Sequence, residues 1–120
     1  VDPVGKPVED GLAILHRAIA RGRGIEFLSS FLSGAFAEGI DTHRPQALRG
    51  IALRAGLTDS DLEDAPNDPA WRTMAAVNRE ALLASGLWGV PSFRVVGYPS
   101  VWGQDRLWMI ERDLLAATRT

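Results

Sequence analysis

The chain has 120 residues, of which 46% are hydrophobic, and its formal net charge is -2. This length predicts one domain with an ordinary core, and the balanced charges argue against nucleic acid, whose phosphates require a basic face. No apolar stretch is long enough for a membrane span or a signal peptide, so we expect a cytoplasmic protein without membrane contact. The sequence contains no cysteine. This chain can therefore form no disulfide, and it has no thiolate to act as a nucleophile or as a metal ligand.

The first part of the chain has a helical period. The segment from Val8 to Arg21 predicts an amphipathic helix whose apolar stripe consists of Val8, Leu12, Leu15 and Ile19. A second helix is expected from Ile25 to Gly39, with an apolar face made of Leu28, Phe31, Leu32, Ala35 and Phe36. Glycines separate the two patterns, so the helices are expected to form a hairpin.

Two shorter helices are expected next. Asp41 or Thr42 is a suitable cap for a helix through Pro45 to Ala55, and the inward side chains of this helix are Leu48, Ile51 and Ala52. Thr58 and Asp61 have the spacing of a capping box, which predicts a short helix that ends before Pro66.

A longer helix is expected from Pro69 to about Ser85, because Asp68 is a good cap and proline is favoured at the first helical position. Its candidate inward residues are Trp71, Met74, Val77 or Asn78, and Ala81. Gly86 marks its end.

The period then changes from helix to strand. Residues 92–96 are β-branched and aromatic, residues 97–100 have turn composition, and Val101 and Trp102 form a second short strand. A helix follows from Gln104. The fold class is therefore α+β and predominantly helical, with a helical domain over residues 1–86 and a ββα part over residues 87–120. An isolated hairpin is marginally stable in water, so this one must join other strands or lie on helices.

Two motifs in the last 35 residues carry a family resemblance. Residues 86–93 read GLWGVPSF and residues 101–107 read VWGQDRL. This pattern resembles the 2-hydroxychromene-2-carboxylate isomerases and kappa-class glutathione transferases, relatives of the DsbA-type disulfide oxidoreductases. The resemblance implies a helical domain inserted into a thioredoxin fold, followed by the last two strands and the last helix, with the N-terminal βαβ part absent from this chain.

The resemblance also implies a glutathione site. The resemblance implies that the Val90-Pro91 bond is cis. A cis bond would leave the backbone N–H and C=O of Val90 free to pair with a cysteinyl peptide. The alternative is that Pro91 only begins an edge strand. At the second motif, Gly103, Gln104, Asp105 and Arg106 form the turn that receives the γ-glutamyl end of glutathione, with Asp105 facing its ammonium group. A helix N-terminus favours a carboxylate at this point, although Asp105 is equally compatible with a purely helix-stabilising role.

Other polar and aromatic residues are weaker candidates. Trp88 and Trp102 are candidates for the wall of an apolar substrate pocket or for the core. His16 and His43 lack catalytic neighbours and are expected at the surface. The acidic residues from Asp59 to Asp64 lack the glycine and the bidentate glutamate of a metal loop, so a solvated helix is expected there and no metal site.

The resemblance implies a glutathione-dependent isomerase of aromatic degradation, with a small aromatic substrate. The catalytic residue, a serine or cysteine, is expected upstream of Val1. One alternative is a DsbA-like thiol-disulfide oxidoreductase, and another is a non-enzymatic helical interaction module. We expect exposed hydrophobic surface where the missing strands would pack, and a partner in the form of the N-terminal thioredoxin half, another chain or a homodimer.

Overall fold

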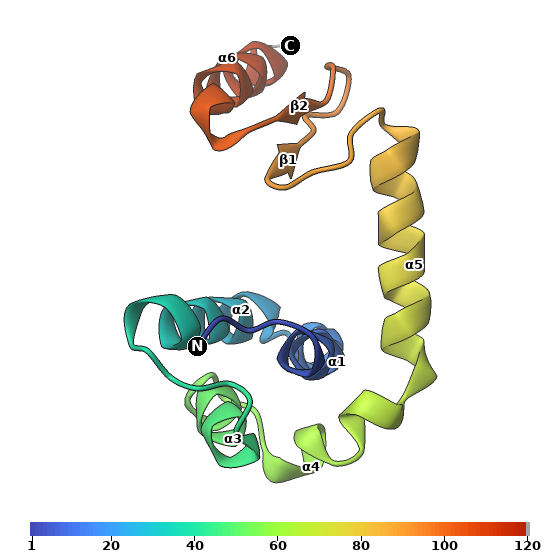
Figure 1. The fold of residues 1–120 in the computed structure, drawn as a ribbon. Coiled ribbons are helices and arrows are strands. Elements are labelled where there is room, and N and C mark those ends of the chain that lie inside the picture. Colours follow the sequence, from blue (N-terminus) through green and yellow to red (C-terminus); the bar gives the residue numbers. More distant parts are fainter. Residues whose placement is uncertain (120) are drawn as a thin grey trace. The chain divides into compact units, whose positions relative to one another are not determined.

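The computed structural model describes residues 1–119 and is mostly helical, with one small antiparallel sheet of two strands (Figure 1). The chain forms two compact units, residues 1–74 and residues 75–120. Helix α5 (Pro69–Ala84) begins in the first unit and ends in the second. The α+β class expected from the sequence is confirmed. The sequence predicts a domain boundary after residue 86, two residues beyond the last residue of α5. This boundary remains a prediction.

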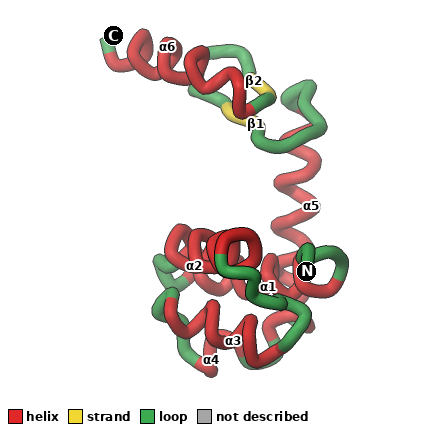
Figure 2. Tube along the Cα trace, turned by 60° about the vertical axis from the view of Figure 1, so that its left-hand side comes forward, coloured by secondary structure: helices red, strands yellow, loops and turns green. Residues whose placement is uncertain are grey.

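The first unit consists only of helices and loops (Figure 2). Its elements ahead of α5 are α1 (Lys6–Ala20), α2 (Gly24–Leu32), the π-helical turn η1 (Ser33–Ala37), α3 (Pro45–Arg54), α4 (Asp59–Leu62) and the 3-10 turn η2 (Ala65–Asn67). Helix α1 packs on α2, α4 and η2, and α2 packs on α3. The helix expected from Ile25 to Gly39 is therefore divided into an α-helix and a π-helical turn.

The core of this unit lies where α1, α2 and α3 meet. Leu48, Ile51 and Ala52 of α3 are buried, as the helical period predicts. Phe27 of α2 is also buried, and the indole N–H of Trp71 donates to the backbone oxygen of Pro66 at 3.2 Å. Trp71 therefore ties the beginning of α5 to this core.

The expected apolar stripe of α1 is only partly the buried face. Leu15 is half-buried against the core, but Val8, Leu12 and Ile19 are exposed. The face that packs inward carries Pro7, Gly11, Ala13, Ile14 and Ala18. Both faces contain apolar residues at helical spacing, but the inward face has the smaller side chains. The helical period alone therefore does not tell which apolar side of α1 is buried.

The expected apolar face of α2 is buried only in part. Ala35 is buried and Phe31 is half-buried against the core, as expected, but Leu28, Leu32 and Phe36 lie at the surface, and Phe27 is buried instead. The buried side of α2 and η1 is the side that contacts α3: a Cβ on Gly34 would lie only 3.0 Å from the Cδ1 of Ile51. Helix α2 packs on α1 and α3 and does not bury all of its apolar side chains. The apolar side chains that these contacts do not cover are exposed to solvent.

Helix caps follow the sequence signals in two of three cases. Thr58 and Asp61 form the expected capping box, with the Thr58 N–H 2.8 Å from Oδ2 of Asp61. Asp68 accepts from the N–H of Ala70 at 2.9 Å, as expected at the start of α5. The expected cap of α3 is wrong, because Arg44 holds the N-cap position. The carboxylate of Asp41 instead accepts a hydrogen bond from the backbone N–H of His43, two residues further along the chain. This bond belongs to a local turn and not to the helix N-terminus.

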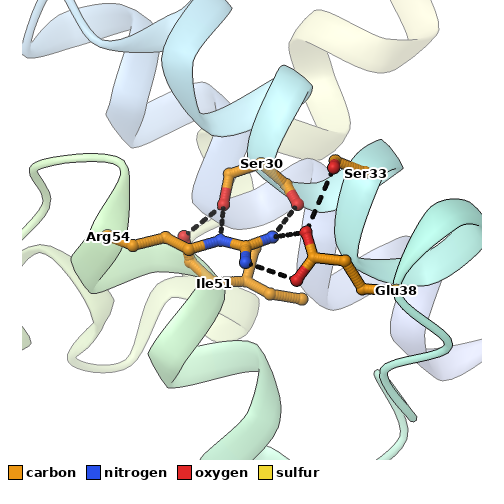
Figure 3. A network of polar contacts seen from close by, with 5 residues as sticks. All are labelled: Ser30, Ser33, Glu38, Ile51 and Arg54. Carbon is orange, nitrogen blue, oxygen red and sulfur yellow. Dashed lines mark hydrogen bonds and ion pairs between the residues drawn. The ribbon is translucent and has the colours of Figure 1, made fainter.

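Arg54 joins α3 to the end of α2 and to η1 (Figure 3). Its guanidinium donates to the hydroxyl and the backbone oxygen of Ser30 at 2.6 and 2.8 Å, and to both carboxylate oxygens of Glu38 at 2.7 and 2.9 Å. The hydroxyl of Ser33 donates to the same carboxylate. The Arg54 hydrogen bond, followed by the Ser33 one, lowers the pKa of Glu38.

The second unit has short strands, β1 (Ser92–Phe93) and β2 (Val101–Trp102). The expected first strand is thus shorter than residues 92–96, and the turn is closed between Val95 and Tyr98, whose N–H donates to the Val95 oxygen at 3.0 Å. Gly97 has a φ of 87° within this turn, a conformation that favours glycine.

The last helix begins with a 3-10 turn, η3 (Gln104–Arg106), before α6 (Leu107–Thr118). The residues of α5 expected to face inward are exposed beyond Trp71, including Met74 and Val77, and so are Asn78 and Ala81. Val101 is the one fully buried hydrophobic side chain among residues 75–119. Exposed apolar surface is therefore present, as the sequence predicts. Among residues 1–119, no helix combines the length and the apolar character needed to cross a membrane.

Candidate functional site

The β-hairpin brings the two sequence motifs together. Ser92 pairs with Trp102 in the antiparallel register, and one position further the N–H of Gly103 donates to the backbone oxygen of Pro91 at 3.0 Å. The Val90-Pro91 bond is cis, which confirms the conformation that the resemblance implies. Pro91 is therefore hydrogen-bonded to Gly103, the residue that precedes the 3-10 turn at the start of the last helix.

Val90 presents an open length of backbone beside this contact. The residue is 83% exposed. In the described part of the chain, no backbone group accepts from its N–H or donates to its carbonyl oxygen. An extended peptide could therefore form main-chain hydrogen bonds at Val90, in the manner of an added strand.

The amino end of the last helix supplies further donors. Gly103 adopts a φ of 114°, which turns the chain from β2 into η3. Its own N–H is used by Pro91, so it is not available to a ligand. Between residues 1 and 119, the N–H groups of Gln104 and Asp105 have no hydrogen-bond acceptor, as is usual in the first turn of a helix. These two groups form the positive end of the helix.

Asp105 lies against the glycine at this turn. A Cβ on Gly103 would meet Oδ1 of Asp105, the end of an exposed side chain that can move aside, so glycine is favoured here chiefly for its φ. The carboxylate of Asp105 is exposed and is thus available to a cation. The side chains of Gln104 and Arg106 are exposed as well, and neither forms a hydrogen bond or ion pair with any residue from 1 to 119.

Trp88 and Trp102 form one aromatic surface next to Val90. Their rings are stacked, with centroids 5.6 Å apart and planes at 29°, and both rings are exposed. Gly89 makes this stacking possible, because a Cβ at that position would lie 2.7 Å from the Nε1 of Trp102. The hydroxyl of Ser92 donates to the backbone oxygen of Gly89. Gly89 and Ser92 therefore hold the loop that carries Val90.

These two supporting residues are absent from the site expected from the sequence. Both lie inside the GLWGVPSF motif. The only signal in the sequence was a glycine between two large residues, which indicates a close approach of another group to the backbone. It does not indicate that the approaching group is the indole ring of Trp102.

The histidines and the acidic segment belong to the first unit, whereas the residues of the candidate site belong to the second. His43 is exposed and its Nδ1 lies 3.1 Å from Oδ1 of Asp41, and a backbone hydrogen bond from His43 lowers the pKa of that carboxyl. Asp59 is held by Arg49 at 2.6 and 2.8 Å, which lowers the pKa of Asp59. His16 is half-buried in α1. Asp41 and Asp59 thus have structural partners, and the short helix expected at the acidic segment is present.

Comparisons with known proteins give the superfamily. The model of the DSBA-like thioredoxin domain family matches residues 4–115. A comparison with curated proteins and a comparison with solved structures found no match. The family match covers both units and nearly the whole chain, and it supports a superfamily of thiol-related or glutathione-related oxidoreductases and isomerases. This chain therefore belongs to the DSBA-like thioredoxin domain family.

Proposed function

We propose that this chain is the glutathione-binding part of a glutathione-dependent isomerase that acts on intermediates of aromatic degradation. The observation that carries the proposal is the hydrogen bond between Gly103 and Pro91. It holds an open peptide edge and the positive end of a helix next to each other within one small unit. Glutathione is a short acidic peptide with a carboxylate and an ammonium group at its γ-glutamyl end, so it matches both features.

Each part of glutathione has a proposed partner. The cysteinyl unit pairs with the backbone N–H and C=O of Val90, as an added strand would. The γ-glutamyl carboxylate accepts from the N–H groups of Gln104 and Asp105, where the helix end favours negative charge. The Asp105 carboxylate pairs with the γ-glutamyl ammonium group, and Arg106 and Gln104 line the rim.

The aromatic surface accounts for the second substrate. Trp88 and Trp102 lie beside Val90 and are exposed, so they form an apolar wall next to the proposed position of the thiol. In the proposed reaction, the thiolate adds to an unsaturated carbon of the substrate. The same C–S bond breaks after the substrate has changed its geometry. The residue that activates the thiol is proposed to lie outside this chain, in a segment that precedes Val1.

The experiment is a calorimetric titration of the chain with reduced glutathione. Asp105→Asn removes one charge and should weaken binding about tenfold, since a hydrogen bond to a charged group contributes roughly 1.5–3 kcal/mol. Glu111→Gln is the matched control, because Glu111 is an exposed carboxylate of α6 outside the proposed site. Its affinity should equal that of the wild type.

A glutathione analogue without the α-ammonium group sharpens this test. Asp105→Asn should change its affinity little, because the partner of the carboxylate is already missing. If wild type and Asp105→Asn bind glutathione equally well, Asp105 does not belong to the site. If neither binds glutathione at all, the non-enzymatic interaction module becomes the better interpretation.

The second candidate function is a DsbA-like thiol-disulfide oxidoreductase, which the family match favours equally at the level of the superfamily. It requires a Cys-x-x-Cys pair, and residues 1–120 contain no cysteine. The segment encoded immediately before Val1 separates the two candidates. A Cys-x-x-Cys pair there would favour the oxidoreductase, and a single serine at that position would favour the isomerase.

A further inference from the structure

Gly89, the residue that precedes Val90, is held on two sides by one cross-strand pair. Ser92 of β1 and Trp102 of β2 are partners in the antiparallel register, so their side chains leave the hairpin on the same face. The hydroxyl of Ser92 donates to the backbone oxygen of Gly89. The indole ring of Trp102 lies so close that a Cβ on Gly89 would be 2.7 Å from its Nε1 and 3.3 Å from its Cδ1. Both side chains of the pair therefore converge on Gly89.

The glycine at position 89 provides space, and its backbone conformation does not require glycine. Gly86, three residues earlier, has a φ of 81°, but Gly89 lies outside this positive range. The ring that fills the space beside Gly89 is stacked on Trp88, with centroids 5.6 Å apart. Trp102 therefore cannot move away from Gly89 without losing this stacking.

The other side of Val90 is held as well. The backbone oxygen of Pro91 accepts from the N–H of Gly103 at 3.0 Å. Val90 thus lies between two residues that are both hydrogen-bonded to the hairpin, while its own side chain is 83% exposed. A peptide that adds to the hairpin at Val90 would meet a backbone whose direction is already set. Binding then avoids the entropy that ordering this residue would cost.

We infer that Ser92 and Trp102 are positioning residues of the peptide-binding edge. They act through Gly89, by ordering Val90 before the ligand binds. The inference rests on the proposed function for the identity of the ligand, glutathione, and it adds the residues that set the affinity of the edge. Fixing the backbone of one residue changes an equilibrium by roughly five- to thirtyfold, and release of Val90 should weaken glutathione binding by a factor in this range.

The first test is a calorimetric titration of the full 120-residue chain with reduced glutathione. Ser92→Ala removes the hydroxyl that holds Gly89 and should weaken binding by roughly fivefold or more. Ser92→Thr keeps a hydroxyl on a β-branched side chain, which suits a strand, and should bind like the wild type. Ser100→Ala is the matched control. Ser100 is a half-buried serine of the same hairpin without a side-chain hydrogen bond among residues 1–119, so its variant should also bind like the wild type.

Gly89→Ala tests the second contact independently of Ser92. Its Cβ needs the space that the Trp102 ring occupies, so the ring must move and Gly89 loses its packing. Glutathione affinity should fall by a similar factor. Because the φ of Gly89 is outside the range that favours glycine, a loss of affinity in this variant reports the contact with the ring.

The order of Val90 without ligand separates this inference from the proposed function. The heteronuclear NOE of the Val90 amide reports its motion on the picosecond to nanosecond scale. It should be lower in Ser92→Ala and Gly89→Ala than in the wild type and Ser100→Ala. If the wild type binds no glutathione but the two variants lose order at Val90, the proposed function fails and the positioning of the edge stands.

Two results would overturn the inference. In the first, Asp105→Asn weakens glutathione binding while Ser92→Ala and Gly89→Ala bind it like the wild type, so the proposed function stands without this positioning. In the second, Ser92→Ala unfolds at a lower urea concentration but keeps both its glutathione affinity and the order of Val90. Ser92 would then have a purely structural role.

Discussion

Gly103 shows how one residue without a side chain controls the geometry of a site. Its φ of 114° is unfavourable for any other amino acid, and the carboxylate of Asp105 fills the space that a Cβ would need. The N–H of the same residue holds Pro91. The position of the proposed peptide edge and that of the proposed acidic partner therefore both depend on this glycine.

Gly103→Ala should destabilise the chain by roughly 1–3 kcal/mol, because the alanine is strained at this φ and displaces Asp105. Gly50→Ala is the control, since Gly50 lies inside α3 and a Cβ there would meet no atom within 4 Å. That substitution should stabilise by about 0.5–1 kcal/mol. Urea denaturation measures both changes, and equal effects would contradict the role given to Gly103.

Glu38 provides a pH-dependent contribution through a single ion pair. Its pKa is lowered in the folded chain, chiefly by the hydrogen bond from Arg54 and then by that from Ser33. A carboxyl group whose pKa is lower in the folded state than in the unfolded state stabilises the fold above its ordinary pKa. That stabilisation disappears as the pH falls through the lowered value.

Glu38→Gln, which cannot titrate, should therefore lower the melting temperature at pH 7, and this loss should shrink as the pH falls through the lowered pKa of Glu38. The pair is at the surface, so added salt should also reduce the loss at pH 7. Arg54→Ala should lose more, and part of its loss should persist in acid, because the hydrogen bonds from Arg54 to Ser30 do not depend on the protonation of Glu38. Thermal melts over a series of pH values decide, and a Glu38→Gln loss that stays constant as the pH falls would contradict this account.

At the scale of the element, α1 has apolar residues on two sides but buries only one of them. Ile14 is 5% exposed and Ile19 is 62% exposed, although both are isoleucines in the same helix. The side that carries alanines and glycine lies against α2, α4 and η2. The other side, which carries Val8, Leu12 and Ile19, is exposed.

The two isoleucines offer a direct comparison. Ile14→Ala should destabilise the chain by about 2–5 kcal/mol, because it leaves a cavity among packed side chains. Ile19→Ala removes the same atoms from an exposed position and should change stability by no more than about 0.5 kcal/mol. Chemical denaturation followed by circular dichroism measures both. Similar losses would show that the face of α1 with Ile19 is covered in solution.

At the scale of the whole molecule, the two units differ in how much of a core they contain. The buried cluster of the first unit joins α1, α2, α3 and the beginning of α5. The second unit, as far as residue 119, has one fully buried hydrophobic side chain, Val101. Leu107, Trp108, Leu114 and Leu115 of α6 are all exposed.

Amide hydrogen exchange of the 120-residue chain should reflect this difference. Stability against local opening depends on buried apolar contacts, so the amides of α6 should exchange much faster than those of α1 and α3. Mass spectrometry of peptic fragments resolves the three helices. Equal protection of α6 and α1 would show that another surface, such as a second copy, covers α6 in solution.

Much of the secondary structure was predictable from local chemistry. The capping box at Thr58, the cap and proline that start α5, and the glycines at helix ends depend only on neighbouring residues, and all are present. The π-helical turn was not predictable, because the local sequence favours an ordinary helix. The expected cap of α3 failed for a local reason, since the Asp41 carboxylate accepts from the N–H of His43 within its own turn.

The candidate site divides in the same way. Its residues could be named from two short motifs, because the resemblance is carried by those motifs. The supporting role of Gly89 and Ser92 could not be predicted from these motifs, because it depends on where the Trp102 ring lies across the hairpin. Likewise, only the hairpin register shows that the N–H of Gly103 is already used by Pro91.

The sequence by itself determined most of the helical elements and the hairpin, because caps, turns and periodicity act between residues close together along the chain, and its two motifs carry the resemblance that indicates the superfamily. The tertiary structure decided which apolar face of each helix is buried. The physical reason is that burial depends on the size of side chains on both partners of a contact. A periodic pattern in one helix contains only half of that information.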